Sequence, residues 1–228
     1  MRAIRTLVRS ALAVLLLASF FSASPAQAAA RSPQVPVSGT ALATFFAAHG
    51  QTIDVNTQQL DLQRTSMPLS TAFQVQAFVG ISTTVGVYNA AAASPALYQV
   101  YPGAASGGWF SVGSFRAGPQ RLVVSLFDAS SALQGSSTYL SADNTDFGFY
   151  NTGAPGTFYS QDARNAGGSA RILAFNGTGA FAGSTWLCTE TGAGPGGDFA
   201  DVITLVQFQF APVGTEPSTW TRVKRLYR

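Results

Sequence analysis

The chain is poor in charge and in the side chains that carry most chemistry. Only 10% of its 228 residues are charged, and it has one cysteine, Cys188, and one histidine, His49. A single cysteine excludes an intramolecular disulfide framework, so stability has to come from a hydrophobic core or a bound metal. Cys188 alternates with Trp186 in the run TWLCTE, which favours a buried thiol on a strand. A chain of this length can bury a sizeable core without cross-links.

The motifs of common enzymes are also missing. His49 lies in the run FFAAHG, where a helix C-terminal cap or a surface position accounts for it. The sequence has no G-x-S-x-G elbow, no zinc-type histidine pair and no glycine-rich phosphate loop followed by Lys and Ser or Thr. A glycosidase needs only two carboxylates, and Glu190 with an aspartate is the remaining candidate pair. We expect a non-catalytic protein, with a carbohydrate-active enzyme as the weaker alternative.

Positive charge gathers at the two ends of the chain. Three of the 13 basic residues lie in residues 1–28, which leaves ten basic against ten acidic residues. Residues 29–221 hold six basic and ten acidic residues, and the only lysine, Lys224, lies beyond them. A nucleic-acid surface needs clustered Lys and Arg to neutralise phosphates. We therefore expect no nucleic-acid partner.

Residues 1–28 have the pattern of a Sec-type signal peptide. A stretch with three arginines precedes the apolar run ALAVLLLASFF, and Ala26-Gln27-Ala28 forms a small-x-small cleavage site. The apolar run is too short for an ordinary membrane span. No adjacent arginine pair marks the twin-arginine route, and no cysteine at the cleavage point allows lipidation. We expect a secreted or cell-surface protein whose mature chain starts at or near Ala29 and has no integral membrane segment.

The rest of the chain is typical of an all-β protein. Short apolar or alternating runs are separated by Gly, Pro, Ser or Asn clusters, which predicts a single β-sandwich or jelly-roll-like domain over residues 71–211. In the run from Val202 to Phe210 the even-numbered residues are mostly apolar and Gln207 and Gln209 alternate with them, as in a strand with one buried face. The nine expected strands are 73–79, 84–88, 97–101, 109–115, 121–127, 147–150, 171–175, 185–189 and 202–210.

Two shorter regions flank this domain. Residues 29–70 form an N-terminal arm in which Thr40 to Ala48 is the one convincing helix, expected to pack onto the sandwich. Residues 212–228 form a short basic tail. Its run Glu216-Pro217-Ser218-Thr219-Trp220 resembles the opening of the bacterial PEP-type sorting signal, but the apolar membrane segment that should follow is missing. The tail is either a short basic helix that contacts an anionic surface, a partner or an export machine, or a frayed end.

A short repeat occurs inside the expected sandwich. The run TVGVYN at 84–89 is similar to DFGFYN at 146–151, and each is followed by a proline-bearing loop and a tyrosine strand. We expect the two runs to occupy comparable positions in one sandwich, with each internal glycine marking a bulge or a place where an aromatic ring covers the backbone. Chance similarity between short aromatic strands is the alternative.

Three carboxylates gather at one glycine-rich turn. Glu190 ends one expected strand, Asp201 begins the next, and Asp198 lies between them in the run ETGAGPGGDFAD. If these strands pair, the loop must bring the carboxylates together, and their repulsion favours a bound cation. Calcium takes roughly 6–8 oxygen ligands, some of which glycine-loop carbonyls can supply. The alternative is a loop held by hydrogen bonds alone.

Asp143 and Asp146, in the run DNTD, are candidate extra ligands if their turn lies beside this loop. An Asx-type turn is the other interpretation of such a run.

The run DFGFYNTGAPGTFYSQDARNAGGSARILAFNGTG, followed by STWLCTETGAGPGGDFADVITLV, resembles the bacterial extracellular family called domain of unknown function 4114. The resemblance covers about residues 75–210 and implies an exported or surface protein with an acidic, calcium-binding closing loop. Ser160 and Asn165 match the family's hairpin, which makes Asn165 a further candidate ligand. Positions of the closing motif that match are Glu190, Asp198, Phe199 and Asp201. Thr191, Gly196 and Ala200 depart from it, so up to three of the family's ligand side chains are lost.

These patterns together predict an exported, non-catalytic module for binding or adhesion. Its ligand would be a glycan or another cell-surface component, with calcium stabilising the acidic loop. A structural component of a surface layer or matrix is the alternative, favoured by low charge and abundant Gly, Ala, Ser and Thr.

Overall fold

The computed structural model of the chain describes residues 29–66, 72–79, 83–103, 108–116, 118–142, 145–192 and 197–209. The expected signal peptide, Asp143 and the expected tail 212–228 lie outside these residues. In the described part of the chain, no helix is both long and apolar enough to cross a membrane.

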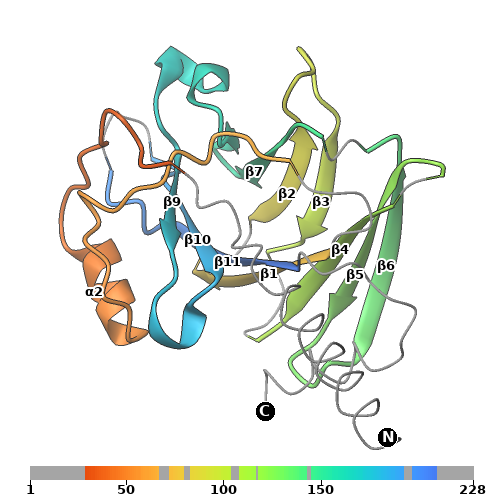
Figure 1. Cartoon of the computed structure of the whole chain (residues 1–228), viewed down its shortest axis with the longest axis horizontal. Coiled ribbons are helices and arrows are strands. Elements are labelled where there is room, and N and C mark those ends of the chain that lie inside the picture. Colours follow the sequence, from red (N-terminus) through yellow and green to blue (C-terminus); the bar gives the residue numbers. More distant parts are fainter. Residues whose placement is uncertain are drawn as a thin grey trace, which may run out of the picture.

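The described residues form two antiparallel sheets, which confirms the all-β sandwich (Figure 1). One sheet has seven strands in the order β6-β5-β4-β1-β11-β10-β9, and the other has four in the order β3-β2-β7-β8. The strands are β1 (Ala72–Val79), β2 (Thr84–Asn89), β3 (Leu97–Tyr101), β4 (Phe110–Arg116), β5 (Arg121–Phe127), β6 (Leu133–Leu140), β7 (Phe147–Gly153), β8 (Gly156–Tyr159), β9 (Ile172–Asn176), β10 (Ser184–Thr189) and β11 (Val202–Gln209). The short helical elements are α2 (Ala41–Ala48), η2 (Asp162–Arg164), η3 (Ala166–Gly168) and η4 (Gly179–Phe181).

All nine expected strands are present, with ends displaced by up to three residues. The sequence analysis missed β6 as a strand and expected β8 only as part of the repeat. β6 is the outer strand of the larger sheet and is exposed at every residue except Tyr139. An edge strand of this kind needs no apolar alternation, so the pattern that reveals a half-buried strand is absent from it.

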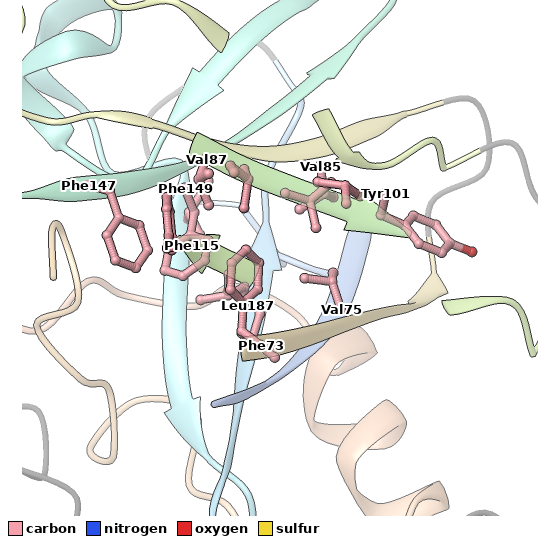
Figure 2. Close-up of a cluster of buried hydrophobic side chains, with 14 of the residues drawn as sticks. Phe73, Val75, Val85, Val87, Tyr101, Phe115, Phe147, Phe149 and Leu187 are labelled. Carbon is pink, nitrogen blue, oxygen red and sulfur yellow. The ribbon is translucent and has the colours of Figure 1, made fainter. Parts of the chain in front are cut away.

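The main core lies between the two sheets. Phe73, Phe115 and Leu187 of the larger sheet face Val87 and Phe149 of the smaller one, as Figure 2 shows. Every one of these five side chains is at most 3% exposed. Burial of this apolar surface is the dominant favourable term for the sandwich.

A second core lies on the outer face of the larger sheet, where the N-terminal arm covers β9, β10 and β11. Leu42 and Phe46 of α2 are each 1% exposed, and they pack in one cluster with Trp186 and Cys188 of β10 (Figure 1). The expected helix, its packing on the sandwich and the buried strand thiol are therefore confirmed. Burial raises the pKa of the Cys188 thiol well above its ordinary value, so the thiol stays protonated.

This second core buries the outer face of β11 over half of its length. We expected a strand with one buried face, but Ile203 and Leu205 on the opposite face are also buried, under the arm. The expectation of a polar outer face was wrong for this half of the strand. Alternation in the sequence identifies a strand with one buried face. A short apolar run that is buried on both faces can be identified only when the element that covers its second face is known.

Gln51, just after α2, joins the arm to the sheet. Its Oε1 accepts hydrogen bonds from the Thr178 N–H at 2.7 Å and from the indole N–H of Trp186 at 3.2 Å. Its amide group donates to the carbonyls of His49 and Thr178. Gln51 is 6% exposed, so these bonds satisfy polar groups that water cannot easily reach. His49 is the C-terminal cap of α2, as expected.

The repeated runs pair with each other at the centre of the smaller sheet. In the antiparallel β2–β7 ladder, Gly86 lies opposite Tyr150 and Tyr88 lies opposite Gly148. A Cβ on Gly148 would come within 2.6 Å of the Tyr88 ring, and one on Gly86 within 2.4 Å of the Tyr150 ring. Each tyrosine therefore covers the backbone of the glycine across from it, which confirms the expected role of these glycines.

Candidate functional site: the acidic closing loop and the edge pocket

The acidic loop closes a hairpin, as expected. β10 and β11 pair antiparallel with Thr189 opposite Val202, so Glu190 and Asp201 leave the ladder side by side. The Glu190 side chain is one of the neighbouring groups that act on the pKa of Asp201. The hairpin geometry thus brings together two of the three expected carboxylates.

Glu190 points back into its own loop. It is 8% exposed, and its two carboxylate oxygens accept hydrogen bonds from the N–H groups of Gly192 at 2.7 Å and Phe199 at 3.3 Å. A Cβ on Gly197 would lie 1.7 Å from the Glu190 Oε2 atom, and one on Gly192 would lie 2.6 Å from Oε1. These glycines leave room for the carboxylate, because any side chain there would collide with it.

Asp201 is held by Thr191. Its Oδ2 accepts hydrogen bonds from the Thr191 N–H and from the Thr191 hydroxyl, both at 2.7 Å. Partial burial acts to raise the pKa of Asp201, but hydrogen bonds, chiefly those from the Thr191 N–H and hydroxyl, outweigh it and lower the pKa below its ordinary value. Thr191 stands where the resembling family has an aspartate, and here it serves as a donor instead of a ligand.

Asp198 is engaged separately. Its Oδ1 accepts a hydrogen bond from the Ala200 N–H at 3.0 Å, which forms an Asx-type turn with the buried Phe199 at its centre. The carbonyl of Gly197 accepts a hydrogen bond from the Ser38 N–H at 3.0 Å, which ties the loop to the arm. Across the described ranges, no group of three or more His, Cys, Asp or Glu side chains is gathered as a metal site. A calcium site at this loop stays a prediction.

Arg171, which the sequence analysis did not single out, supports the same loop. Its guanidinium donates a hydrogen bond to the carbonyl of Gly192 and lies over the Phe158 ring, 5.4 Å from the centroid. Its own carbonyl accepts a hydrogen bond from the Glu190 N–H at 2.9 Å. No sequence motif marks this arginine, because its contacts join β8, β9 and the closing loop.

The other candidate ligands have partners of their own. Asp146 accepts a hydrogen bond from Arg64 at 3.2 Å in a partly exposed ion pair. Asn165 is 8% exposed and locks the turn after β8, because its amide exchanges hydrogen bonds with the backbone of Tyr159 at 2.9 Å in each direction. Asp143 lies outside the described residues.

A second candidate site arises from the unequal widths of the two sheets. β3 is the edge of the four-stranded sheet and lies against β4, β1 and β5, so β6 extends beyond it (Figure 1). A cavity of about 270 Å³ lies along this step, which we call the edge pocket. Its lining includes Gln99, Ser111, Leu126, Ser136, Ser137 and Tyr139.

A larger cavity, of about 360 Å³, lies between the arm and β9. Gln59 lines it, but its amide is fully engaged: it accepts from the Val35 N–H and donates to the carbonyls of Val35 and Val55. The most deeply buried polar group at this cavity therefore already has its partners within the protein.

The fold defines an all-β sandwich with a helical arm packed on its outer face. Comparisons with models of known families, with curated proteins and with solved structures find no match to this chain. The family resemblance stays an expectation, and the functional argument rests on the geometry described above.

Proposed function

We propose that this chain is an exported, non-catalytic β-sandwich module that binds a ligand at the cell surface or outside the cell. The observation that carries the proposal is the edge pocket, an accessible cavity on a rigid sandwich. None of the described residues that line either cavity is an Asp or Glu. The carboxylates that a glycosidase would need instead accept hydrogen bonds from their own loop.

The test is binding without turnover. The purified mature chain is incubated with insoluble envelope material and polysaccharides, and both the bound fraction and released reducing sugar are measured. We expect saturable binding and no released sugar. Sugar release that is lost in the Glu190→Gln variant would instead identify an enzyme.

Export is proposed on the signal-peptide pattern of residues 1–28, with cleavage before Ala29. The carbonyl of Ala29 accepts a hydrogen bond from the Asp61 N–H at 2.7 Å, and Arg31 forms an ion pair with Asp162. A mature chain that starts at Ala29 would keep both contacts. N-terminal sequencing of protein from the medium or cell surface should give Ala29 or a close neighbour as the first residue. A chain that retains Met1 would contradict export by this route.

Calcium is proposed to act at the contact between Glu190 and Asp201. In the described part of the chain, ion pairs link Arg31 to Asp162 and Arg64 to Asp146, and none involves these two carboxylates. Two acidic groups in contact repel each other once both are ionised, and a cation relieves that repulsion. Calcium at 100 times its dissociation constant would stabilise the fold by about 2.7 kcal/mol.

Thermal melting with millimolar calcium and with a chelator measures this effect. We expect calcium to raise the melting temperature of the wild type but not of the Asp201→Asn variant. The matched control is Asp128→Asn, because Asp128 caps an exposed Asx-type turn between β5 and β6 and should leave the calcium response unchanged. An unchanged wild-type melting temperature would show that hydrogen bonds alone hold the loop.

A structural role in a surface layer is the second candidate, and the exposed edge strand β6 favours it. Leu133 and Leu140 are 60% and 68% exposed at the two ends of this strand. An open edge with exposed leucines can pair with another chain. Light scattering over a concentration series tests this role: concentration-dependent assembly that Leu133→Lys with Leu140→Lys prevents would support it, and a monomer at all concentrations would exclude it.

A further inference from the structure

We infer that the edge pocket binds one neutral sugar ring of a surface polysaccharide. This inference rests on the proposed function, because it names the ligand class and the site of the same binding module. Four properties of the pocket favour such a ligand: its floor, its walls, its charge and its shape.

The floor of the pocket holds an unused hydrogen-bonding group. Ser111 on β4 is fully buried, and its hydroxyl has no hydrogen-bond partner. A buried polar group without a partner costs about 1–3 kcal/mol, so native proteins seldom retain one without a reason. The hydroxyl is closed off from the cavity in this structure, so a ligand hydroxyl would supply the missing partner after a neighbouring side chain of the lining turns aside.

The walls combine apolar surface with small polar groups. Val124 and Leu126 of β5 face the pocket, and the ring of Tyr139 lies 5.5 Å from that of Tyr98 between centroids. Ser137 brings a hydroxyl to the cavity from the same face of β6 as Tyr139, and Gln99 of β3 also lines it. A sugar ring has the matching character, because its C–H face packs on apolar and aromatic surface while its hydroxyls need donors and acceptors.

Charge narrows the ligand class to neutral sugars. None of the described residues that line the pocket is charged. An anionic sugar such as a uronic acid would lose its hydration there without a cation to compensate, which is unfavourable. Neutral hydroxyls lose less on leaving water and can be satisfied by Ser137 and the other polar groups of the lining.

Backbone irregularities shape the pocket from both sides. In β3 the register shifts between Val85 and Gly86 of its partner strand, which leaves Val100 as an extra residue beside Gln99. In β6 a second shift leaves Gln134 as an extra residue next to Gly135. Bulges bend a strand and redirect its side chains, and they recur next to binding sites. Both bulges adjoin lining residues of this pocket.

The test is calorimetric titration of the mature chain with neutral oligosaccharides of glucose, mannose and galactose, and with an oligogalacturonate as the acidic comparison. The blocking variant is Ser137→Trp, whose new side chain fills the pocket. Its matched control is Thr138→Trp. Thr138 is the next residue of the same exposed strand, and it pairs with Val123, whereas Ser137 pairs with the pocket residue Val124. The side chain of Thr138 therefore faces away from the pocket.

We expect at least one neutral oligosaccharide to bind, with affinity reduced about tenfold or more in Ser137→Trp, a loss of about 1.4 kcal/mol. Thr138→Trp should bind within about a factor of two of wild type. Equal binding by wild type and Ser137→Trp would overturn the assignment of the pocket, and preference for the acidic oligomer would overturn the neutral class.

Failure of this inference can be told apart from failure of the proposed function. Binding to envelope material without binding to any of these sugars would overturn the inference and leave the proposed function standing. Binding to neither would overturn both.

Discussion

Single residues of this chain take their roles from what lies across the backbone from them. Gly148 is needed because the Tyr88 ring covers its Cα, and Gly197 because the Glu190 carboxylate occupies the space of a side chain. Thr191 replaces an expected ligand with two donors to Asp201. Glycine at such a position lets a side chain from another part of the chain approach the backbone closely. The sequence does not reveal this role, because the neighbouring side chain is known only from the structure.

The tyrosine–glycine pairs should make Gly148 intolerant of any side chain. In Gly148→Ala the new Cβ would lie 2.5 Å from the hydroxyl oxygen of the fully buried Tyr88, which forces the ring or the strand to shift. We expect a loss of about 1–3 kcal/mol in the free energy of unfolding, measured in urea. Gly135→Ala in β6 is the matched control, because nothing lies within 4 Å of its Cβ position. Equal effects of the two substitutions would contradict the role of the Tyr88 ring.

Asp201 should make the closing loop sensitive to acid. Its pKa is lower in the folded protein than its ordinary value of 3.8, so its ionised form favours folding. This stability is fully present above about pH 4 and is lost as the pH falls through the folded pKa. Urea unfolding from pH 7 to pH 2 should therefore show a smaller acid-dependent loss for Asp201→Asn than for wild type. Parallel curves would mean that Thr191 does not favour the charged form.

Among the secondary-structure elements, the arm helix α2 and the edge strand β6 differ in how much of their surface is buried. α2 is short, but it closes a core because Leu42 and Phe46 insert against β9 and β10. β6 is long and almost entirely exposed, and it takes its place through its ladder with β5. The first element therefore stabilises the molecule, and the second shapes the step on which the edge pocket lies.

Gln51 should be the polar contact on which the arm most depends. In Gln51→Leu the indole N–H of the fully buried Trp186 and the N–H of Thr178 both lose their acceptor. Leaving buried donors unsatisfied costs about 1–3 kcal/mol each, so we expect a loss of at least about 2 kcal/mol in urea unfolding followed by tryptophan fluorescence. Gln58→Leu, at an exposed amide of the same arm, should cost clearly less. A neutral Gln51→Leu would show that water replaces the lost acceptor.

The molecule as a whole has two cores that share one sheet. The seven-stranded sheet buries one face against the four-stranded sheet and the other, at β9, β10 and β11, against the arm. Removing the arm would expose large side chains such as Trp186, and removing the smaller sheet would expose others such as Phe73. The arm is therefore part of the folding unit of the sandwich.

A chain that begins at residue 72 should fail to fold cooperatively. It would leave Phe175, Trp186 and Leu205 uncovered, and each such side chain contributes about 1.5–3 kcal/mol by burial, against a typical total stability of about 5–15 kcal/mol. In the full chain, Phe46→Ala should cost about 3–5 kcal/mol and the exposed Thr44→Ala little. Near-ultraviolet circular dichroism and calorimetry measure both effects. A truncated chain with a native spectrum and a sharp transition would contradict the shared core.

The sequence by itself determined the features that local periodicity and turns record. Alternation marked nine strands, the run around Phe46 marked the helix, and Cys188 beside Trp186 marked a buried thiol. The hairpin that joins Glu190 to Asp201 followed from two adjacent strands with a glycine-rich loop between them. These features depend on residues close together in the chain, so their physical cause is visible in the pattern.

The tertiary structure alone decided how distant segments cover one another. The burial of Ile203 on the second face of β11 depends on an arm more than 100 residues earlier in the chain, and the place of β6 depends on its ladder with β5. The carboxylate of Glu190 is bound by N–H groups of its own loop because of a backbone path that spacing does not specify. The edge pocket exists because one sheet is three strands wider than the other. Strand order and sheet width are set by long-range burial, and local patterns carry no record of them.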